Sequence, residues 1–133
     1  MKKNLVLIVL LLAALALSGC AKNYDTELTV DMVEFMFEPT EYTIPAGEEI
    51  TLTLTNNGAV EHEFVIMKFG QAVSVPFGDD DEGNIYWEAE ALPGETKTVT
   101  FTAPSDLGEY QIICGTAGHV ENGMLGKMFV VAP

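Results

Sequence analysis

Short runs of alternating apolar and polar residues recur along most of the chain, and they restrict it to a fold built from β-strands. The clearest run is Ile50-Thr51-Leu52-Thr53-Leu54, which ends at the turn residues Asn56-Asn57-Gly58. An alternation of period two places each set of side chains on its own face of a strand, and Asn-Gly is typical of the turn that follows. Similar runs recur roughly every 8–12 residues, and no convincing helical pattern is present. The sequence therefore predicts an all-β fold, a Greek-key β-sandwich of seven to eight strands.

Two local patterns add detail to this sandwich. The apolar parity changes between Met32 and Val33, which predicts a β-bulge in the first strand. The sequence Asp106-x-Gly108-x-Tyr110 resembles a tyrosine corner, in which the tyrosine hydroxyl ties a crossover to a neighbouring strand. Residues 70–84 have the glycines, prolines and acids of a loop, with room for a short helical turn. The predicted strands are residues 28–37, 42–44, 50–54, 62–69, 85–92, 96–102, 109–114 and 127–131.

The N-terminal residues have the features of an export signal. Two lysines precede an apolar run from Leu5 to Leu17, which is too short for a comfortable membrane span. The following Leu17-Ser18-Gly19-Cys20 resembles the lipobox of bacterial lipoproteins, which implies lipidation of Cys20; an ordinary signal peptide with a chance cysteine is the alternative. We predict a signal peptide at 1–19, a lipidated N-terminus and tether at 20–26, and one domain at 27–133. The protein would then be lipid-anchored to the cell membrane on its extracytoplasmic side, periplasmic or outer-facing.

The chain that begins at Cys20 is strongly acidic. It keeps four of the six lysines, because Lys2 and Lys3 are removed, and with twenty acids its net charge is 4 − 20 = −16. Such a chain does not bind nucleic acid, whose phosphates would repel it. The charge suits a redox partner with a basic docking face, while solubility alone is the alternative explanation.

Four potential metal ligands dominate the chemistry of the sequence: His62 and the run Cys114-x4-His119-x4-Met124. With Cys20 lipidated, Cys114 has no cysteine partner for a disulfide, and metal ligation explains a free thiol in an oxidising compartment. A thiolate, two imidazoles and a thioether describe one mononuclear type 1, or blue, copper site. The small residues 115–118 let the chain curl so that His119 returns towards the Cys114 sulfur. Cys114 shares a strand face with Tyr110 and Ile112, so we expect it to point inward.

Each ligand taken singly has a structural explanation: an ordinary strand histidine, a small buried thiol, a core methionine. Other chemistries fit the four together less well. Zinc seldom selects a thioether, a dinuclear copper centre would need a second cysteine in the loop, and Cys–His catalysis lacks an oxyanion donor. We therefore expect a metal site and no enzyme activity.

The same residues resemble a known family. Gly108-Glu-Tyr-Gln-Ile-Ile-Cys114, Gly118-His119 and Gly123-Met124-Leu-Gly126 are similar to the C-terminal signature of the cupredoxins. The resemblance covers most of residues 27–133, with a loop spacing nearest to auracyanin- and rusticyanin-type members and an azurin-like length between cysteine and histidine. It implies a monomeric cupredoxin-like sandwich in which Cys114 is the thiolate, His62 and His119 are equatorial ligands, and Met124 is the weak axial ligand. The exposed edge of His119 would be the port for electrons.

The chain departs from the family pattern beside the ligands. Many cupredoxins carry Asn after the first histidine and Ser or Thr after the cysteine, and these side chains brace the two ligand loops. Glu63 and Gly115 occupy those positions here, with Thr116 as a substitute brace, and Ala117 stands where many members have proline. Because hydrogen bonds around the ligands tune a metal's potential, the sequence does not fix the potential.

Two weaker features have competing interpretations. The run Asp79–Glu82 could bind calcium or dock a basic partner, but it lacks the spacing of an EF-hand loop, and we expect a solvated loop. Four methionines could handle copper through their thioethers, but they fall within strand patterns, and we expect them in the core. They are Met32, Met36, Met67 and Met128.

These observations predict a membrane-anchored blue-copper electron-transfer protein that cycles between Cu(I) and Cu(II) and passes electrons between redox partners. A copper chaperone or buffer that uses the same ligands is the alternative. The single Met124 and the strand-anchored Cys114 favour the carrier, because a chaperone usually has an exposed, methionine-rich site. An accessory domain of an oxidase is disfavoured, since no other domain is attached.

Overall fold

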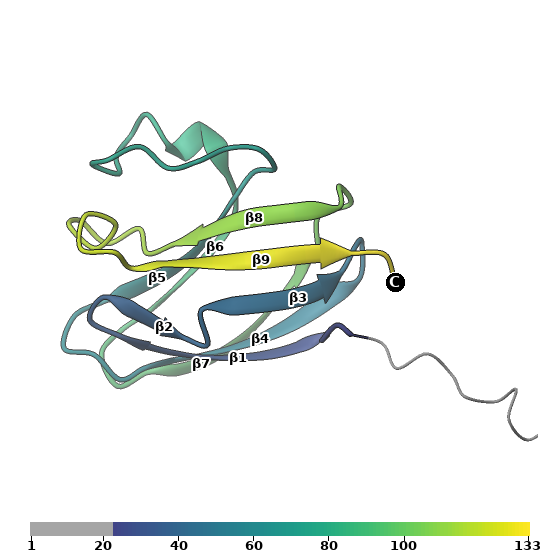
Figure 1. The fold of residues 1–133 in the computed structure, drawn as a ribbon. Helices are drawn as coiled ribbons and strands as arrows, with labels where there is room; N and C mark the ends of the chain where they lie inside the picture. Colours follow the sequence, from purple (N-terminus) through teal and green to yellow (C-terminus); the bar gives the residue numbers. More distant parts are fainter. Residues whose placement is uncertain (1–22) are drawn as a thin grey trace, which may run out of the picture.

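The computed structural model describes residues 23–133, which form two β-sheets packed face to face (Figure 1). Within this part of the chain the only helical element is a single 3-10 turn, η1 (Glu82–Asn84). The predicted all-β sandwich is therefore confirmed. The four-stranded sheet has the order β2-β1-β4-β7, with β1 (Glu27–Val33), β2 (Met36–Glu38), β4 (Glu49–Asn56) and β7 (Thr96–Thr102). The five-stranded sheet has the order β3-β9-β8-β5-β6, with β3 (Glu41–Pro45), β5 (His62–Met67), β6 (Ile85–Ala91), β8 (Gly108–Ile113) and β9 (Leu125–Val131).

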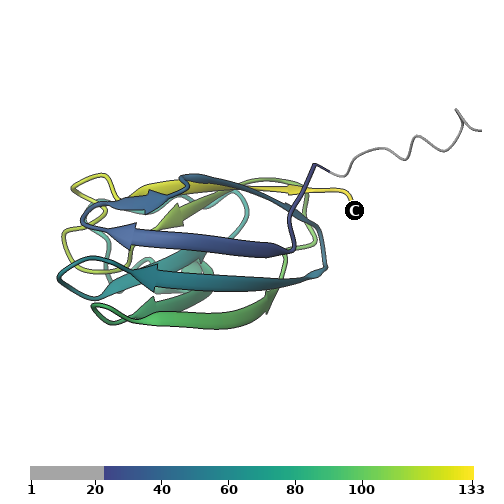
Figure 2. The ribbon, with the colours of Figure 1, turned by 90° about the horizontal axis from the view of Figure 1, so that it is seen from below.

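The chain crosses repeatedly from one sheet to the other, as the Greek-key prediction requires. Strands β1 and β4 pair in parallel, and so do β3 and β9, while all the other paired strands are antiparallel. Parallel neighbours cannot be joined by a tight hairpin, so each such pair needs a connection through the opposite sheet or around its end. The crossovers leave the loops gathered at the two ends of the sandwich (Figure 2).

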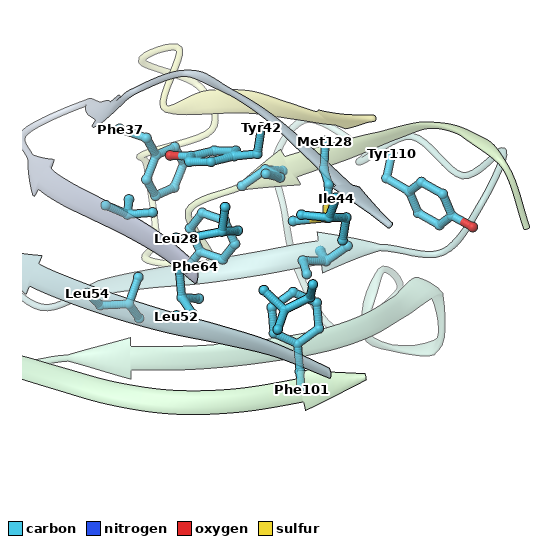
Figure 3. Close-up of a cluster of buried hydrophobic side chains, with 14 of the residues drawn as sticks. Leu28, Phe37, Tyr42, Ile44, Leu52, Leu54, Phe64, Phe101, Tyr110 and Met128 are labelled. Carbon is cyan, nitrogen blue, oxygen red and sulfur yellow. The ribbon is translucent and has the colours of Figure 1, made fainter. Parts of the chain in front are cut away.

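The core lies between the sheets and follows the alternation in the sequence. In β4 the side chains of Ile50, Leu52 and Leu54 are fully buried, and the threonines between them face outward. Figure 3 shows Leu52 and Leu54 opposite Phe64 of the other sheet. Full burial of one such side chain contributes about 1.5–3 kcal/mol. The aliphatic face of β4 therefore holds the two sheets together.

The start of the chain differs from the prediction. The parity change near Met32 is produced by a hairpin, not by a bulge: β1 pairs with β2 so that Met32 lies opposite Phe37 and Val33 opposite Met36. Directly opposed residues share a face, so Met32 and Phe37 are both buried, whereas Met36 is 41% exposed. The hairpin supplies a ninth strand. The prediction that Met36 lies in the core is therefore wrong. Met32, Met67 and Met128 are buried, as predicted.

The tyrosine corner is confirmed. The hydroxyl of Tyr110 donates a hydrogen bond of 2.8 Å to the carbonyl of Asp106. Tyr110 is buried in β8, and Asp106 lies in the connection that brings the chain across from β7. The bond therefore fixes the crossover to the strand that leads to Cys114.

The long loop between β5 and β6, residues 68–84, packs on the outer face of the five-stranded sheet, beside β8 in Figure 1. The buried Asp81 organises it: its carboxylate accepts bonds from the Ser74 N–H (3.0 Å), the Ser74 hydroxyl (2.9 Å) and the Gly78 N–H (3.2 Å). The prediction of a solvated acidic run holds for Asp79, Asp80 and Glu82 and is wrong for Asp81, because the loop folds around that carboxylate.

The predicted signal peptide and Cys20 lie outside the described residues. Of the predicted tether, residues 23–26 are described, and the Asp25 N–H donates to the Thr43 carbonyl at 2.9 Å. Among residues 23–133 no helix is long and apolar enough to cross a membrane.

Candidate metal centre

The four predicted ligands come from separate positions that the fold brings to one end of the sandwich. His62 is the first residue of β5, and Cys114 directly follows β8. His119 and Met124 lie in the loop that joins β8 to β9, at the end of the molecule opposite the C-terminus (Figures 1 and 2). Two ligands are thus fixed by strands, and the other two are carried by one short loop.

The donor atoms of His62, Cys114 and His119 converge. The Cys114 Sγ lies 3.3 Å from the Nδ1 of His119 and 3.7 Å from the Nδ1 of His62, and all three donor atoms lie within 4.8 Å of one another. The two imidazole centroids are 4.8 Å apart. His62 and Cys114 have no exposed surface, and His119 is 6% exposed. The sequence prediction that these three residues meet is correct.

Hydrogen bonds within the loop place Met124 beside this group. The Cys114 N–H donates to the Met124 carbonyl at 3.1 Å, and the Met124 N–H donates to the His119 carbonyl at 2.9 Å. Gly123 turns the chain just before Met124 with φ = 88°, a left-handed conformation that favours glycine. The Met124 side chain is fully buried in the same cluster as Cys114. The loop therefore closes back onto Cys114, and the Met124 side chain is buried in the core.

The brace between the ligand loops is present in altered form. The Thr116 hydroxyl donates to the Glu61 carbonyl at 2.9 Å, which ties the cysteine loop to the residue before His62. The Glu63 N–H points to the Cys114 Sγ at 3.4 Å. The Glu63 side chain lies over Gly115, where an added Cβ would come within 2.0 Å of its Oε2. Glu63 and Gly115 are therefore a matched pair, and Thr116 supplies the cross-loop bond.

Burial sets the protonation of the ligands. It raises the pKa of the Cys114 thiol and lowers the pKa of both His62 and His119, whose proximity to each other lowers that of His62 further. The imidazoles are thus held neutral at pH 7, as metal ligands must be, while the thiol gives up its proton when a cation binds.

The donor set fits a single copper ion. Two imidazole nitrogens face one sulfur in a buried site, and a methionine lies in the same buried cluster as the sulfur. Imidazole suits copper in both oxidation states, thiolate and thioether suit Cu(I), and the His2Cys trigonal set with an axial Met is the blue-copper arrangement. Structural zinc sites use four Cys or His ligands and seldom a thioether.

Comparison with known proteins agrees with this chemistry. The cupredoxin-like domain family matches residues 5–130. The chain belongs to the cupredoxin-like family. It is 35% identical over 112 residues to auracyanin-A of Chloroflexus aurantiacus, covering 73% of this chain and 68% of that protein. It is 33% identical over 117 residues to the chloroplastic plastocyanin of Hordeum vulgare, covering 88% and 68%.

A solved relative has the same fold. The crystal structure of dithionite-reduced auracyanin from Roseiflexus castenholzii superposes with a TM-score of 0.70 at 30% identity, covering 82% of this cupredoxin-like chain and 99% of that one.

Two residues beside the site were missed by the sequence analysis, and both lie in the β1–β2 turn. Phe35, with φ = 78°, packs edge-on against the His119 ring at a centroid distance of 5.1 Å. Glu34 Oε1 lies 4.0 Å from His62 Nε2. Its carboxylate also accepts the Ala59 N–H, which holds the pKa of Glu34 below its usual value. The parity change at Met32 was the available signal, but Glu34-Phe35 lacks the Asn-Gly pattern typical of two-residue hairpin turns.

Proposed function

We propose that this cupredoxin-like chain is a blue-copper electron carrier. Its cofactor is one mononuclear type 1 copper ion, and the chain transfers electrons rather than converting a substrate. The observation that carries the proposal is the convergence of His62 Nδ1 and His119 Nδ1 on the buried Cys114 sulfur. When bound, copper supplies one-electron redox chemistry by alternating between Cu(II) and Cu(I).

The ligand residues have distinct roles in this proposal. When copper binds, Cys114 would provide the thiolate, His62 and His119 would provide imidazole nitrogens, and Met124 would provide the thioether. Burial of all four excludes water, and attachment to β5 and β8 limits movement of the ligands. A site that changes little between oxidation states needs little reorganisation when an electron moves.

His119 is the proposed electron port. It is the only one of the four ligands with measurable exposure, and its neighbours Ala117 and Phe35 are exposed. A partner that docks over these residues would come into contact with the edge of a ligand.

The acidic surface and the N-terminus complete the proposal. Twenty acids favour encounter with a redox partner that has a basic docking face. Cys20, in the lipobox-like Leu17-Ser18-Gly19-Cys20, would carry the lipid that holds a monomeric domain at the extracytoplasmic face of the membrane. Several acyl chains anchor a protein firmly, whereas one holds it only weakly.

Copper exchange and electron exchange separate the carrier from a chaperone. The Cu(I)-loaded protein is mixed with a high-affinity Cu(I) chelator, and its electron exchange with a small redox complex is followed separately by stopped flow. A carrier gives fast electron exchange and slow loss of copper, because every ligand is buried. Rapid copper transfer with slow electron exchange would overturn the carrier proposal in favour of a chaperone.

A further inference from the structure

One buried polar atom at the metal centre has no hydrogen-bond partner. His62 Nε2 has negligible accessible surface and is the only such side-chain nitrogen or oxygen among residues 23–133. A buried N–H without an acceptor costs about 1–3 kcal/mol, so an orphaned atom in a native core calls for an explanation. The Nδ1 of the same ring faces Cys114, so a ligating His62 must carry its proton on Nε2.

The nearest acidic group to this atom is Glu34. Its Oε1 lies 4.0 Å from His62 Nε2, within ion-pair range but longer than a hydrogen bond. A small side-chain rotation or one bridging water closes a gap of this size.

The surrounding backbone is built to leave this space free. A Cβ added to Gly58 would lie 2.6 Å from His62 Nε2 and 2.8 Å from Glu34 Oε1, so any other residue would come between them. The Gly58 N–H is tied to the Asn56 side chain at 2.8 Å, and the Ala59 N–H is tied to Glu34 itself. The loop before His62 thus binds the Glu34 carboxylate through the Ala59 N–H and holds it close to the His62 ring.

We infer that Glu34 is a positioning residue for the copper site: its carboxylate accepts the His62 Nε2–H and lowers the reduction potential of the bound copper. The inference rests on the proposed function. A carboxylate paired with a ligating imidazole fixes the tautomer and ring orientation and makes the ring a stronger donor. A stronger donor and a nearby negative charge both favour Cu(II) over Cu(I).

Two substitutions distinguish the effect of the Glu34 charge from the effect of its hydrogen-bond-accepting oxygen. Glu34→Gln keeps an oxygen for Ala59 and for His62 but removes the charge, whereas Glu34→Ala removes both. Glu121→Gln is the matched control, since Glu121 is an exposed acid on the ligand loop, two residues after His119.

The first readout is the reduction potential of the copper-loaded protein. Glu34→Gln should weaken Cu(II) binding relative to Cu(I) by about tenfold, which raises the potential by about 59 mV. Glu121→Gln should change the affinity for Cu(II) relative to Cu(I) by no more than about twofold, because the Glu121 charge is exposed and screened. If Glu34→Gln shifts the potential no more than Glu121→Gln does, the inference is wrong. If the copper-loaded unsubstituted protein has no blue absorption band, the proposed function itself is wrong.

The second readout needs no metal. In the copper-free protein, long-range ¹H–¹⁵N correlation spectra should show the His62 proton on Nε2, and Glu34→Ala should speed exchange of that proton about tenfold. A proton on Nδ1 in the unsubstituted protein, or unchanged exchange in Glu34→Ala, would contradict the inference.

Discussion

At the scale of single residues, the metal centre combines family ligands with its own bracing. Glu63 and Gly115 take positions where cupredoxins commonly carry bracing side chains, and the fold compensates with neighbouring groups. The Thr116 hydroxyl bonds the carbonyl of Glu61, and the Glu63 backbone rather than its side chain approaches the Cys114 sulfur. The brace is therefore carried by one hydroxyl that points across the loops.

Thr116→Val tests this brace, because valine keeps the shape of threonine and loses only the hydroxyl. The Glu61 carbonyl then loses its partner, and we expect the free energy of unfolding of the copper-free protein to fall by about 1 kcal/mol in urea titrations. Thr100→Val on the exposed face of β7 is the control and should change it by less than about 0.5 kcal/mol. Equal effects at the two positions would show that Thr116 is not a brace.

At the scale of elements, the 68–84 loop depends on a buried carboxylate. Asp81 accepts three hydrogen bonds from Ser74 and Gly78, and the first of these, from the Ser74 N–H, does most to lower its pKa. Val73 and Phe77 of the loop then pack over the outer face of the five-stranded sheet, close to Val120 of the ligand loop. Asp81 thus supports the surroundings of the metal centre from outside the sandwich.

Asp81→Asn should change how stability depends on pH. A carboxyl group whose pKa is lowered by folding stabilises the fold above its unfolded pKa of about 3.9, and this contribution is lost as the pH falls through the lower, folded value. The urea midpoint of the unsubstituted protein should therefore exceed that of Asp81→Asn at neutral pH. The difference between the two midpoints should become smaller below about pH 4.

The exposed neighbour Asp80 provides the control, since Asp80→Asn should change the urea midpoint at neutral pH far less than Asp81→Asn does. If the urea midpoints of Asp81→Asn and of the unsubstituted protein differ by the same amount at every pH, the Asp81 charge does not stabilise the fold.

Elements with strong local patterns could be predicted from the sequence. The alternation in β4 predicted its buried face, and Asp106-x-Gly108-x-Tyr110 predicted the tyrosine corner. The β1–β2 hairpin could not be predicted in the same way, because its turn, Glu34-Phe35, has no glycine or asparagine to mark it. Tertiary contacts hold Phe35 at positive φ against His119, and such contacts leave no trace in local propensity.

The same distinction between local patterns and contacts made by the fold applies to the metal centre. The convergence of His62, Cys114 and His119 could be predicted, because few residue types bind copper and their spacing is distinctive. The surroundings of the ligands could be predicted only in part. Glu63 and Gly115 were identified because they directly follow His62 and Cys114, whereas Glu34 and Phe35 come close to the centre only through the fold.

At the scale of the whole molecule, the dominant property is negative charge. Residues 23–133 hold three lysines and all twenty acids, a net charge of 3 − 20 = −17. Between Lys or Arg and acidic side chains, the one ion pair in this part of the chain is Lys127–Glu109, at 3.0 Å, so the field is largely uncompensated. Such a field attracts cations and repels anions over several ångströms.

Electron transfer with small complexes should reveal this field. The rate constant with a cationic complex should fall by about tenfold as the ionic strength rises from about 10 to 150 mM, because the Debye length shrinks from about 30 to 8 Å. With an anionic complex of similar size the rate constant should rise. Stopped-flow measurements in which both reagents respond in the same direction would show that the net charge does not steer encounter.

The central claim is that Cys114 binds copper with His62 and His119, and the visible spectrum of the copper-loaded protein tests it most directly. We predict an intense band at about 600 nm from thiolate-to-copper charge transfer, which disappears on reduction and is absent from Cys114→Ser. Far-UV circular dichroism of the variant serves to verify that the sandwich is retained. A copper-loaded protein without the band, or a Cys114→Ser variant that keeps it, would contradict the assignment.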